Sequence, residues 1–378
     1  MKKASFIVLL MMLMSVNTMW SQDVNKLLSD LKTEIAPDGR TAIWDVNTVT
    51  QDGVLTLYGK VDSNKLNAAI EKALNAENVK FKNNLIVLEN TQENPWAFVK
   101  LSVASLRTSG RHSAEIATQG IMGMPVQVLE KDGDWLRVRM PDDYIAYVPA
   151  NSLIRVDAQR MAQWKQSKRY IVTTYQTRLV TEPKGDVTVS DLVMGNILEY
   201  KDKKGKWIEL ATPDGRSGYV EARDVEEFSQ WAKQDFDAAR IETTARRMMG
   251  SGYLWGGTST KLTDCSGLAK VSYFSNGIIL QRDASQQALT GKIIKPEDWK
   301  SAKTGDLLFF GSISGRVTHV AIYLRDGEYI HCSGQVKINS VDSAADNYLT
   351  TPFLSISRID GEVGTKGIVA VRNHPWYF

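Results

Sequence analysis

One cysteine has the sequence context of a nucleophile. Cys265 lies in the segment LTDCSGLAK, directly after a loop rich in glycine and aromatic residues. The apolar residues Leu268, Val271 and Phe274 recur at helical spacing, and Asp264 is a suitable N-cap for that helix. Cys265 would then lie in the first turn, where free amide groups favour an anion and lower the pKa of a thiol. A thiolate could attack a carbonyl, although a buried helix cysteine without chemical function is the alternative interpretation.

Two of the four histidines lie close together in the segment VTHVAIYLRDGEYIHCSG. It alternates as strand, Asp-Gly turn and strand, which predicts a hairpin that brings His319 and His331 together. His319 could act as the base for the thiol, and His331 could orient that base. A two-residue turn at Asp326–Gly327 would put the two histidines on opposite faces, so we expect an extra loop residue or a bulge. Sheet histidines without a catalytic role are the alternative.

The second cysteine, Cys332, reads as a small buried hydrophobic residue. Because only two cysteines are present, a disulfide scaffold is excluded, and their spacing does not fit a metal site. One disulfide between Cys265 and Cys332 is still possible in an oxidising compartment. The expected chemistry requires no metal and no cofactor.

The first 22 residues have the pattern of a signal peptide, with a basic start and an apolar run from Phe6 to Met14. That run is too short to span a bilayer, and no later segment is apolar enough to do so. We therefore expect an exported protein of the periplasm or cell envelope, soluble after removal of residues 1–22. The formal charge of +3 gives no reason to expect nucleic-acid binding.

The middle of the chain contains an internal repeat with a constant offset of 72 residues, as from Gly123 to Gly195. Glycine, tryptophan, proline, aspartate, tyrosine and valine recur in register, for example Trp135 with Trp207. Each copy alternates as short strands joined by Asp-Gly or Lys-Gly turns, which predicts two small β-barrels.

The flanking segments mix helices and strands. Residues 23–95 read as helix, strand, helix and strand, and Ser63 or Asn64 can cap the second helix. From Asp224 onward we expect one amphipathic helix that ends at Gly250, then the Cys265 helix, then strands from DLLFF onward. A helical segment followed by a sheet-rich segment predicts an α+β fold.

The motifs YLWGG, DCSGL, TGDLLFF, THVAIYL and YIHCSG together resemble the NlpC-type cell-wall cysteine peptidases, which have a papain-like fold. The repeat resembles bacterial Src-homology-3-like (SH3-like) domains. The resemblance implies a multidomain protein: an α+β papain-like peptidase domain preceded by two SH3-like β-barrels and a small N-terminal α+β unit. The predicted divisions are a signal peptide (1–22), the N-terminal unit (23–95), the first barrel (96–160), the second barrel (165–228) and the catalytic domain (230–378).

The same resemblance implies roles for the residues. Cys265 would be the nucleophile, His319 the base and His331 the third catalytic residue. Two barrels before such a domain are similar to the γ-D-glutamyl-L-diamino acid endopeptidases, which cleave murein stem peptides that have a free N-terminal L-alanine. The diamino acid would be meso-diaminopimelate, and Asp283 would bind the amine, unless it serves only as a helix cap. The substrate-binding positions implied by this likeness are Asp283, Ser285, Tyr253, Trp255, Asp264 and Ser266, with Glu115 and Tyr144 from the first barrel.

Two other functions are compatible with the sequence. The protein could bind the cell wall without catalysis, the barrels being binding modules. Alternatively, the fold could carry an amidase or acyltransferase activity. The expected partners are murein stem peptides (L-Ala-γ-D-Glu-diamino acid), and we expect a monomer.

Overall fold

The computed structural model describes residues 23–378, which form two compact units that meet at residues 93 and 94. The signal-peptide prediction for residues 1–22 lies outside the described residues. In the described part of the chain, no helix combines the length and the apolar character needed to cross a membrane.

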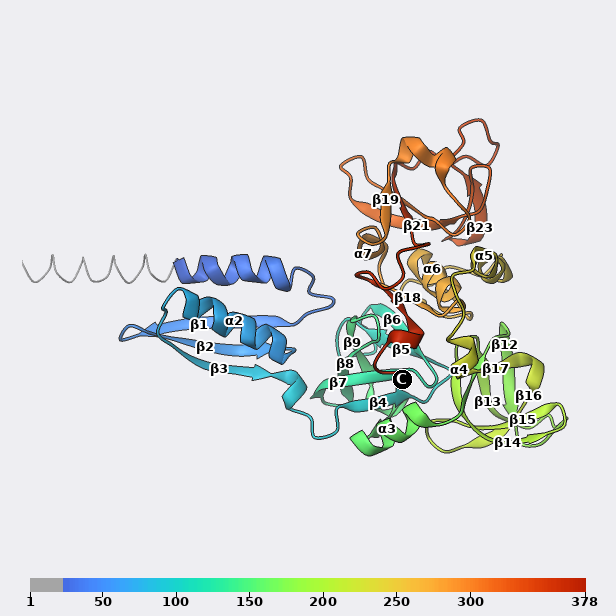
Figure 1. Ribbon diagram of the computed structural model, residues 1–378, viewed down its shortest axis with the longest axis horizontal. Coiled ribbons are helices and arrows are strands. Elements are labelled where there is room, and N and C mark those ends of the chain that lie inside the picture. Colours follow the sequence, from blue (N-terminus) through green and yellow to red (C-terminus); the bar gives the residue numbers. More distant parts are fainter. Residues whose placement is uncertain (1–22) are drawn as a thin grey trace, which may run out of the picture. The chain divides into compact units, whose positions relative to one another are not determined.

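The N-terminal unit is an α+β structure (Figure 1). A helix over residues 23–35 precedes β1 (Trp44–Gln51), β2 (Val54–Val61), α2 (Asn64–Ala76) and β3 (Phe81–Val87). The sheet order is β1-β2-β3, and Ser63 caps α2 through its side chain. The sequence prediction missed β1, because threonines occupy both less exposed positions in the second half of this strand, Thr48 and Thr50, and weaken its apolar alternation.

Two seven-stranded sheets follow and form the barrels (Figure 1). The first has the order β10-β4-β7-β8-β9-β5-β6 and the second the order β13-β12-β16-β15-β14-β11-β17. Read from β10 and from β17, the two orders are the same, so the 72-residue repeat predicted the architecture correctly. The first barrel comprises β4 (Trp96–Val99), β5 (Val103–Arg107), β6 (Ile116–Ile121), β7 (Pro125–Asp132), β8 (Trp135–Arg139), β9 (Ile145–Pro149) and β10 (Leu153–Val156). The second comprises β11 (Arg169–Val172), β12 (Gln176–Val180), β13 (Thr188–Val193), β14 (Ile197–Lys204), β15 (Trp207–Ala211), β16 (Ser217–Glu221) and β17 (Val225–Glu227), and α3 (Ala158–Gln166) connects the barrels.

The segment after the second barrel forms two helices, so the prediction of one helix ending at Gly250 was wrong. These are α4 (Phe228–Trp231) and α5 (Ala238–Arg247). Asp237 starts α5 by accepting hydrogen bonds from the backbone amides of Ala239 and Arg240, and its own amide donates to the side chain of Asn276. This cap, fixed by a residue distant in sequence, breaks the helix that the periodicity alone would continue.

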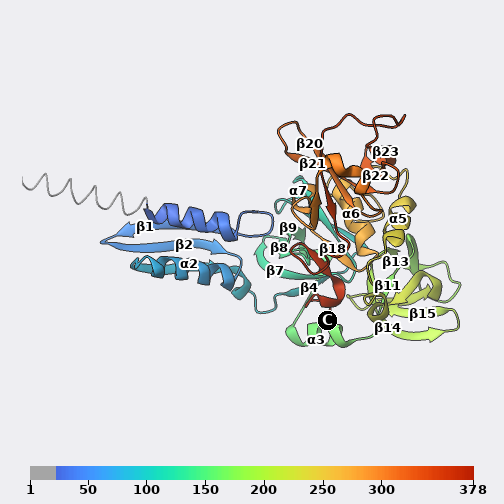
Figure 2. The ribbon, with the colours of Figure 1, turned by 45° about the horizontal axis from the view of Figure 1, so that its top comes forward.

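The C-terminal domain packs helix α6 (Cys265–Phe274) against a six-stranded sheet of order β19-β24-β20-β21-β22-β23 (Figure 2). Its remaining elements are β18 (Ile278–Leu280), α7 (Ala284–Gln287), β19 (Lys292–Ile294), β20 (Leu307–Gly311), β21 (Val317–Tyr323), β22 (Glu328–Ser333), β23 (Gln335–Ser340), β24 (Phe353–Arg358) and β25 (Ile368–Ala370). β18 pairs with β25 in a separate two-stranded sheet. The predicted papain-like α+β fold is confirmed.

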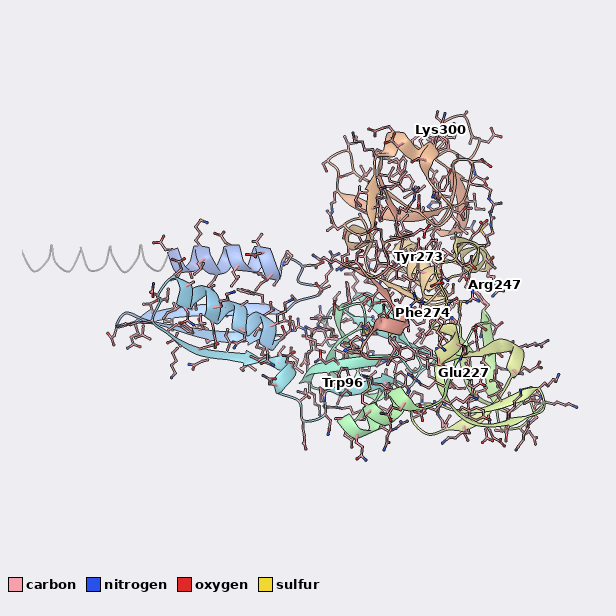
Figure 3. All side chains as sticks on the ribbon, in the orientation of Figure 1. Trp96, Glu227, Arg247, Tyr273, Phe274 and Lys300 are labelled. Carbon is pink, nitrogen blue, oxygen red and sulfur yellow. The ribbon has the colours of Figure 1, made fainter. Side chains whose placement is uncertain are left out.

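The C-terminal end of helix α6 contacts both the core of this domain and the second barrel (Figure 3). Tyr273 is buried, and its hydroxyl donates to the carbonyl of Gly305 inside the catalytic domain. Phe274, the next residue, packs against Trp231 and faces Gly195 of the second barrel. Neighbouring aromatic side chains therefore anchor opposite sides of the same helix end.

Candidate active site

The start of α6 holds Cys265 in a fixed position. Asp264 is the N-cap, as predicted, and its carboxylate accepts hydrogen bonds from the amides of Gly267 (2.7 Å) and Gly256 (3.0 Å). Cys265 is the first residue of the helix and is only 8% exposed. Gly267 must be glycine, because a Cβ atom there would lie 1.9 Å from the carbonyl oxygen of Gly257. The helix start is therefore packed directly on the glycine loop that precedes it.

The predicted histidine hairpin is present, with the extra loop residue that the sequence required. Tyr323 pairs with Tyr329, and the Leu324 amide donates to the Glu328 carbonyl, which leaves three residues in the loop instead of two. This register puts both histidines on one face of the sheet. The Nε2 atom of His319 lies 2.7 Å from Nδ1 of His331. The expectation of a corrected register is confirmed.

A further residue, Asn339, is hydrogen-bonded to the histidine pair. The Nε2 atom of His331 lies 2.9 Å from Oδ1 of Asn339 on β23, and the side-chain amide of Asn339 donates to the carbonyl of Asn347 (2.6 Å). Sequence reasoning missed Asn339. A signal was present, because a tight turn at Gly334 pairs His331 with Lys337 and places a residue two positions further along on the same face.

The helix that carries the Cys265 thiol packs against β21, the strand that carries His319. Cys265 packs in one buried cluster with Val320, the neighbour of His319, and the backbone amide of Val320 acts to lower the pKa of the thiol. Burial and the Asp264 carboxylate raise the pKa of Cys265 to about 11, although two backbone amides and Arg282 act in the opposite direction. The expected low thiol pKa was therefore wrong for the substrate-free protein, because loss of water outweighs the helix start.

His319 also carries a perturbed pKa. Burial and the neighbouring His331 lower its pKa to about 4, and Lys337 contributes in the same direction while Asp264 opposes it. Burial likewise lowers the pKa of His331. At neutral pH the resting site therefore holds a neutral thiol and two neutral imidazoles.

The second cysteine is not bonded to the first. Both are free thiols, and Cys332 is fully buried, with its sulfur 3.3 Å from the carbonyl oxygen of Thr263. Burial raises the pKa of Cys332 to about 12. Its interpretation as a small buried residue agrees with these surroundings.

A buried arginine that the sequence analysis did not single out links two of the predicted site residues. Arg282 is 1% exposed; its guanidinium bonds both oxygens of Asp264 (2.5 and 3.3 Å) and Oγ of Ser266 (2.8 Å). It also lies 3.8 Å from the carboxylate of Asp283. Burial lowers the pKa of Arg282, but the charge and hydrogen bonds of Asp264, together with the charge of Asp283 and with Tyr144, outweigh burial, and the net shift is upward. The available signal was a basic residue directly before the predicted amine-binding aspartate.

The sequence left two roles open for Asp283, a helix cap and a binding group for the substrate amine, and its surroundings are compatible with both. It caps α7 in a reciprocal capping box with Gln286. Its carboxylate also accepts a hydrogen bond from the hydroxyl of Tyr144 in the first barrel (3.3 Å). The Asp283 side chain is 29% exposed and is therefore partly accessible to solvent. Ser285 follows in the first turn of α7 and is partly exposed.

The first barrel is attached to the catalytic domain by buried polar contacts. Gln119 accepts hydrogen bonds from the amide of Thr258 and the hydroxyl of Ser259, both at 2.9 Å. Lys270 on α6 forms an ion pair with Asp142 at 2.6 Å. These contacts hold Tyr144 in place next to Asp283.

The remaining predicted positions surround the thiol or its loop. Ser266 is buried, and Tyr253 is half-buried, with a pKa raised well above its usual value by burial and by the cysteine and Asp264 charges. Trp255 is 61% exposed on the glycine loop. The next residue of that loop, Gly256, packs so closely on Ile116 of the first barrel that a Cβ would lie 2.3 Å from the Ile116 carbonyl. Glu115, next to Ile116, is exposed.

A cavity of about 580 Å³ lies elsewhere, between the second barrel and α5. Its wall includes Tyr175, Arg240, Arg247 and Phe274, but neither Cys265 nor the two histidines. Figure 3 marks Arg247 and Phe274 on this side of the domain. The cavity is separate from the candidate active site.

Comparison with known families agrees with the geometry. The model of the NlpC/P60 family matches residues 250–358, which include the cysteine and both histidines. A dipeptidyl-peptidase 6 from Lysinibacillus sphaericus is 31% identical over 264 residues, which are 65% of this chain and 92% of the relative. The chain belongs to the NlpC/P60 family.

Further relatives share the barrel part of this NlpC/P60 protein. The model of the bacterial dipeptidyl-peptidase SH3 domain matches residues 106–153, in the first barrel. A γ-D-glutamyl-L-lysine dipeptidyl-peptidase from Bacillus cereus is 26% identical over 62% of this chain and 73% of its own length. A solved NlpC/P60 structure from Bacillus cereus covers 70% of this chain and 99% of its own, with a TM-score of 0.60 and 23% identity. This structural likeness supports the shared fold.

Proposed function

We propose that this protein is a cysteine peptidase that hydrolyses the bond between γ-D-glutamate and the L-diamino acid of murein peptides. The observation that carries the proposal is the position of Cys265 at the start of α6, which packs against β21, the strand that carries His319. His319 in turn contacts His331 at 2.7 Å. The names of the two relatives described above support this substrate class.

In the proposed mechanism, the Cys265 thiol gives its proton to His319 while the sulfur bonds to the γ-carbonyl carbon of D-glutamate. Thiol and imidazole are both neutral beforehand, so this transfer accompanies the attack instead of preceding it. The backbone amide of Cys265, at the helix start, donates to the developing oxyanion. The imidazolium of His319 then protonates the leaving amine as the carbon–nitrogen bond breaks. Water, deprotonated by His319, hydrolyses the thioester and releases the γ-carboxylate and the thiol.

The free amine of an N-terminal L-alanine would bind next to Asp283. The partly exposed carboxylate there can pair with an ammonium group, and the Tyr144 hydroxyl fixes its orientation. Arg282 then has a positioning role, because it holds Asp264, the cap of the nucleophile helix, beside Asp283. The other substrate positions that we propose are Ser285, Tyr253, Trp255, Ser266 and Glu115.

The substrate also fits the proposed location. Residues 1–22 carry the signal-peptide pattern that would deliver the protein to the cell envelope, where murein peptides are released. The preferred diamino acid would be meso-diaminopimelate.

The test is incubation of the purified protein, residues 23–378, with L-Ala-γ-D-Glu-meso-diaminopimelate and with its N-acetylated form. We expect release of L-Ala-γ-D-Glu from the free tripeptide, detected by mass, and little release from the acetylated one. Cys265→Ala should be inactive. Full activity of that variant would contradict the proposal, and products of another mass would indicate amidase or acyltransferase chemistry. Retention on murein without any cleavage would favour a binding protein.

A further inference from the structure

Four groups form a continuous line from β21 to the loop after β23. His319 contacts His331, His331 contacts Asn339, and Asn339 donates to the backbone carbonyl of Asn347. His331 is 1% exposed and Asn339 is 8% exposed, so little water reaches these bonds. Each bond therefore needs a matched donor and acceptor.

The carbonyl of Asn347 fixes the direction of every hydrogen bond in this line. A carbonyl only accepts, so the Asn339 group at 2.6 Å from it must be the NH2, and Oδ1 must face His331. Oδ1 only accepts as well, so the Nε2 atom of His331 carries the proton. In the neutral ring, Nδ1 of His331 is then the acceptor, and His319 must donate to it from Nε2. Nδ1 of His319 is left as the ring atom with a free lone pair.

We infer that Asn339 is a positioning residue that sets the tautomers of both histidines and so makes Nδ1 of His319 the atom that takes the Cys265 proton. This inference rests on the proposed function and adds a positioning residue to the three proposed catalytic residues. Asn339 acts through His331 and need not touch the substrate.

The other groups around the two histidines do not fix the position of the proton on either imidazole. Lys337 on β23 and Asp264 at the start of α6 are the charged groups that act on the two histidines. Neither is hydrogen-bonded to an imidazole in the described structure. The rings of Phe310 and Tyr329 pack on His319 and His331 and offer no acceptor for the proton on Nε2. Among the described residues, Asn339, oriented by the carbonyl of Asn347, is the group that accepts the proton of Nε2 of His331.

The experiment compares Asn339→Leu, Asn339→Asp and a control, Asn276→Leu. Asn276 is a buried asparagine of the same domain, 1% exposed, that bonds backbone and side-chain groups near α5 and not the histidines. For each variant, kcat and KM are measured from pH 4 to 9 with the free tripeptide. The histidine tautomers are measured without substrate by two-bond ¹H–¹⁵N correlation spectra of the imidazoles.

We expect Asn339→Leu to lower kcat by about 100-fold with KM unchanged, since a base in the wrong tautomer loses most of its effect. Asn339→Asp keeps an acceptor and should restore most of kcat. Its added negative charge should move the acidic limb of kcat/KM upward by roughly one pH unit. Asn276→Leu should lower stability but leave kcat, KM and the pH profile unchanged.

The spectra separate this inference from the proposed function. In the wild-type protein both histidines should carry the proton on Nε2, whether or not the tripeptide is cleaved. Protonation of His331 on Nδ1, or an Asn339→Leu variant with the wild-type kcat and pH profile, would overturn the inference. If the tautomers are as expected but the tripeptide is not cleaved, the substrate assignment fails and the assignment of Asn339 stands.

Discussion

The hydroxyl of Tyr144 in the first barrel donates to the carboxylate of Asp283 in the catalytic domain, across 139 residues of chain and 3.3 Å of space. Asp283 simultaneously caps α7 and lies 3.8 Å from the buried guanidinium of Arg282. The Asp283 carboxylate therefore contacts the first barrel, the start of α7 and Arg282, the arginine that is hydrogen-bonded to the N-cap of the Cys265 helix. The first barrel is part of the proposed substrate site and not only an appended module.

Replacing Asp283 by asparagine should separate its two roles. Asparagine caps helices as well as aspartate does, so α7 should persist, but the charge that pairs with an amine is lost. We expect KM for the free-amine tripeptide to rise by about 10–100-fold, the equivalent of one hydrogen bond to a charged group. Steady-state kinetics and the thermal midpoint check this.

The matched control is Asp237→Asn, which changes the cap of α5 away from the site. It should leave KM unaltered. An Asp283→Asn variant with a normal KM and an unchanged thermal midpoint would mean that Asp283 is only a helix cap.

Tyr144→Phe should have a smaller effect on the same parameter. The variant keeps the ring and removes one hydrogen bond to Asp283. Because a single such bond contributes about 0.5–1.5 kcal/mol, KM should rise by roughly 2–10-fold while kcat changes little. Tyr219→Phe is the control, since Tyr219 makes the same kind of bond to Glu209 at 2.7 Å in the second barrel. Equal kinetics for Tyr144→Phe and the wild type would remove Tyr144 from the substrate site.

The pH dependence follows from the two perturbed groups. The pKa of His319 is about 4, so the base stays neutral and active above that value, and kcat/KM should fall only as the pH drops through it. The pKa of the Cys265 thiol is about 11, so little thiolate is present at pH 7. Alkylation by iodoacetamide should therefore be slower than for free cysteine and should accelerate steadily between pH 7 and 10.

The alkylation control is Cys265→Ala, in which the fully buried Cys332 should remain unmodified. A wild-type alkylation rate that is already maximal at pH 6 would show a preformed thiolate–imidazolium pair and contradict this prediction.

The Asp264–Arg282 pair should dominate the local stability. Asp264→Ala leaves a guanidinium that is 1% exposed without its main partner, which should cost about 3–5 kcal/mol of unfolding free energy. The double variant Asp264→Leu with Arg282→Met should recover much of that loss, because neither charge is then buried. Urea unfolding followed by tryptophan fluorescence measures both. Asp235→Ala, which breaks an exposed pair with Arg372, should change nothing measurable.

Local patterns in the sequence predicted much of this protein. The 72-residue repeat predicted two small β-barrels, which share one strand order in the structure, and the Asp-Cys start of a helix predicted the Asp264 cap. The parity of the histidine hairpin required a longer loop, and a three-residue loop is present. Within each barrel copy, at the helix start and in the hairpin, residues that are close in sequence set the outcome, because backbone periodicity and turn geometry are local.

Only the tertiary structure decided the rest. The α4–α5 break depends on Asn276 and the Asp283 site on Tyr144, each brought in from a distant part of the chain. The hydrogen bond from His331 to Asn339 depends on the pairing of β22 with β23. The direction of the Cys265 pKa shift depends on burial, which outweighs the helix start and is not encoded in any short motif. The sequence by itself determined which residues could react, whereas long-range packing and the exclusion of water decided their protonation, their partners and the surface that meets the substrate.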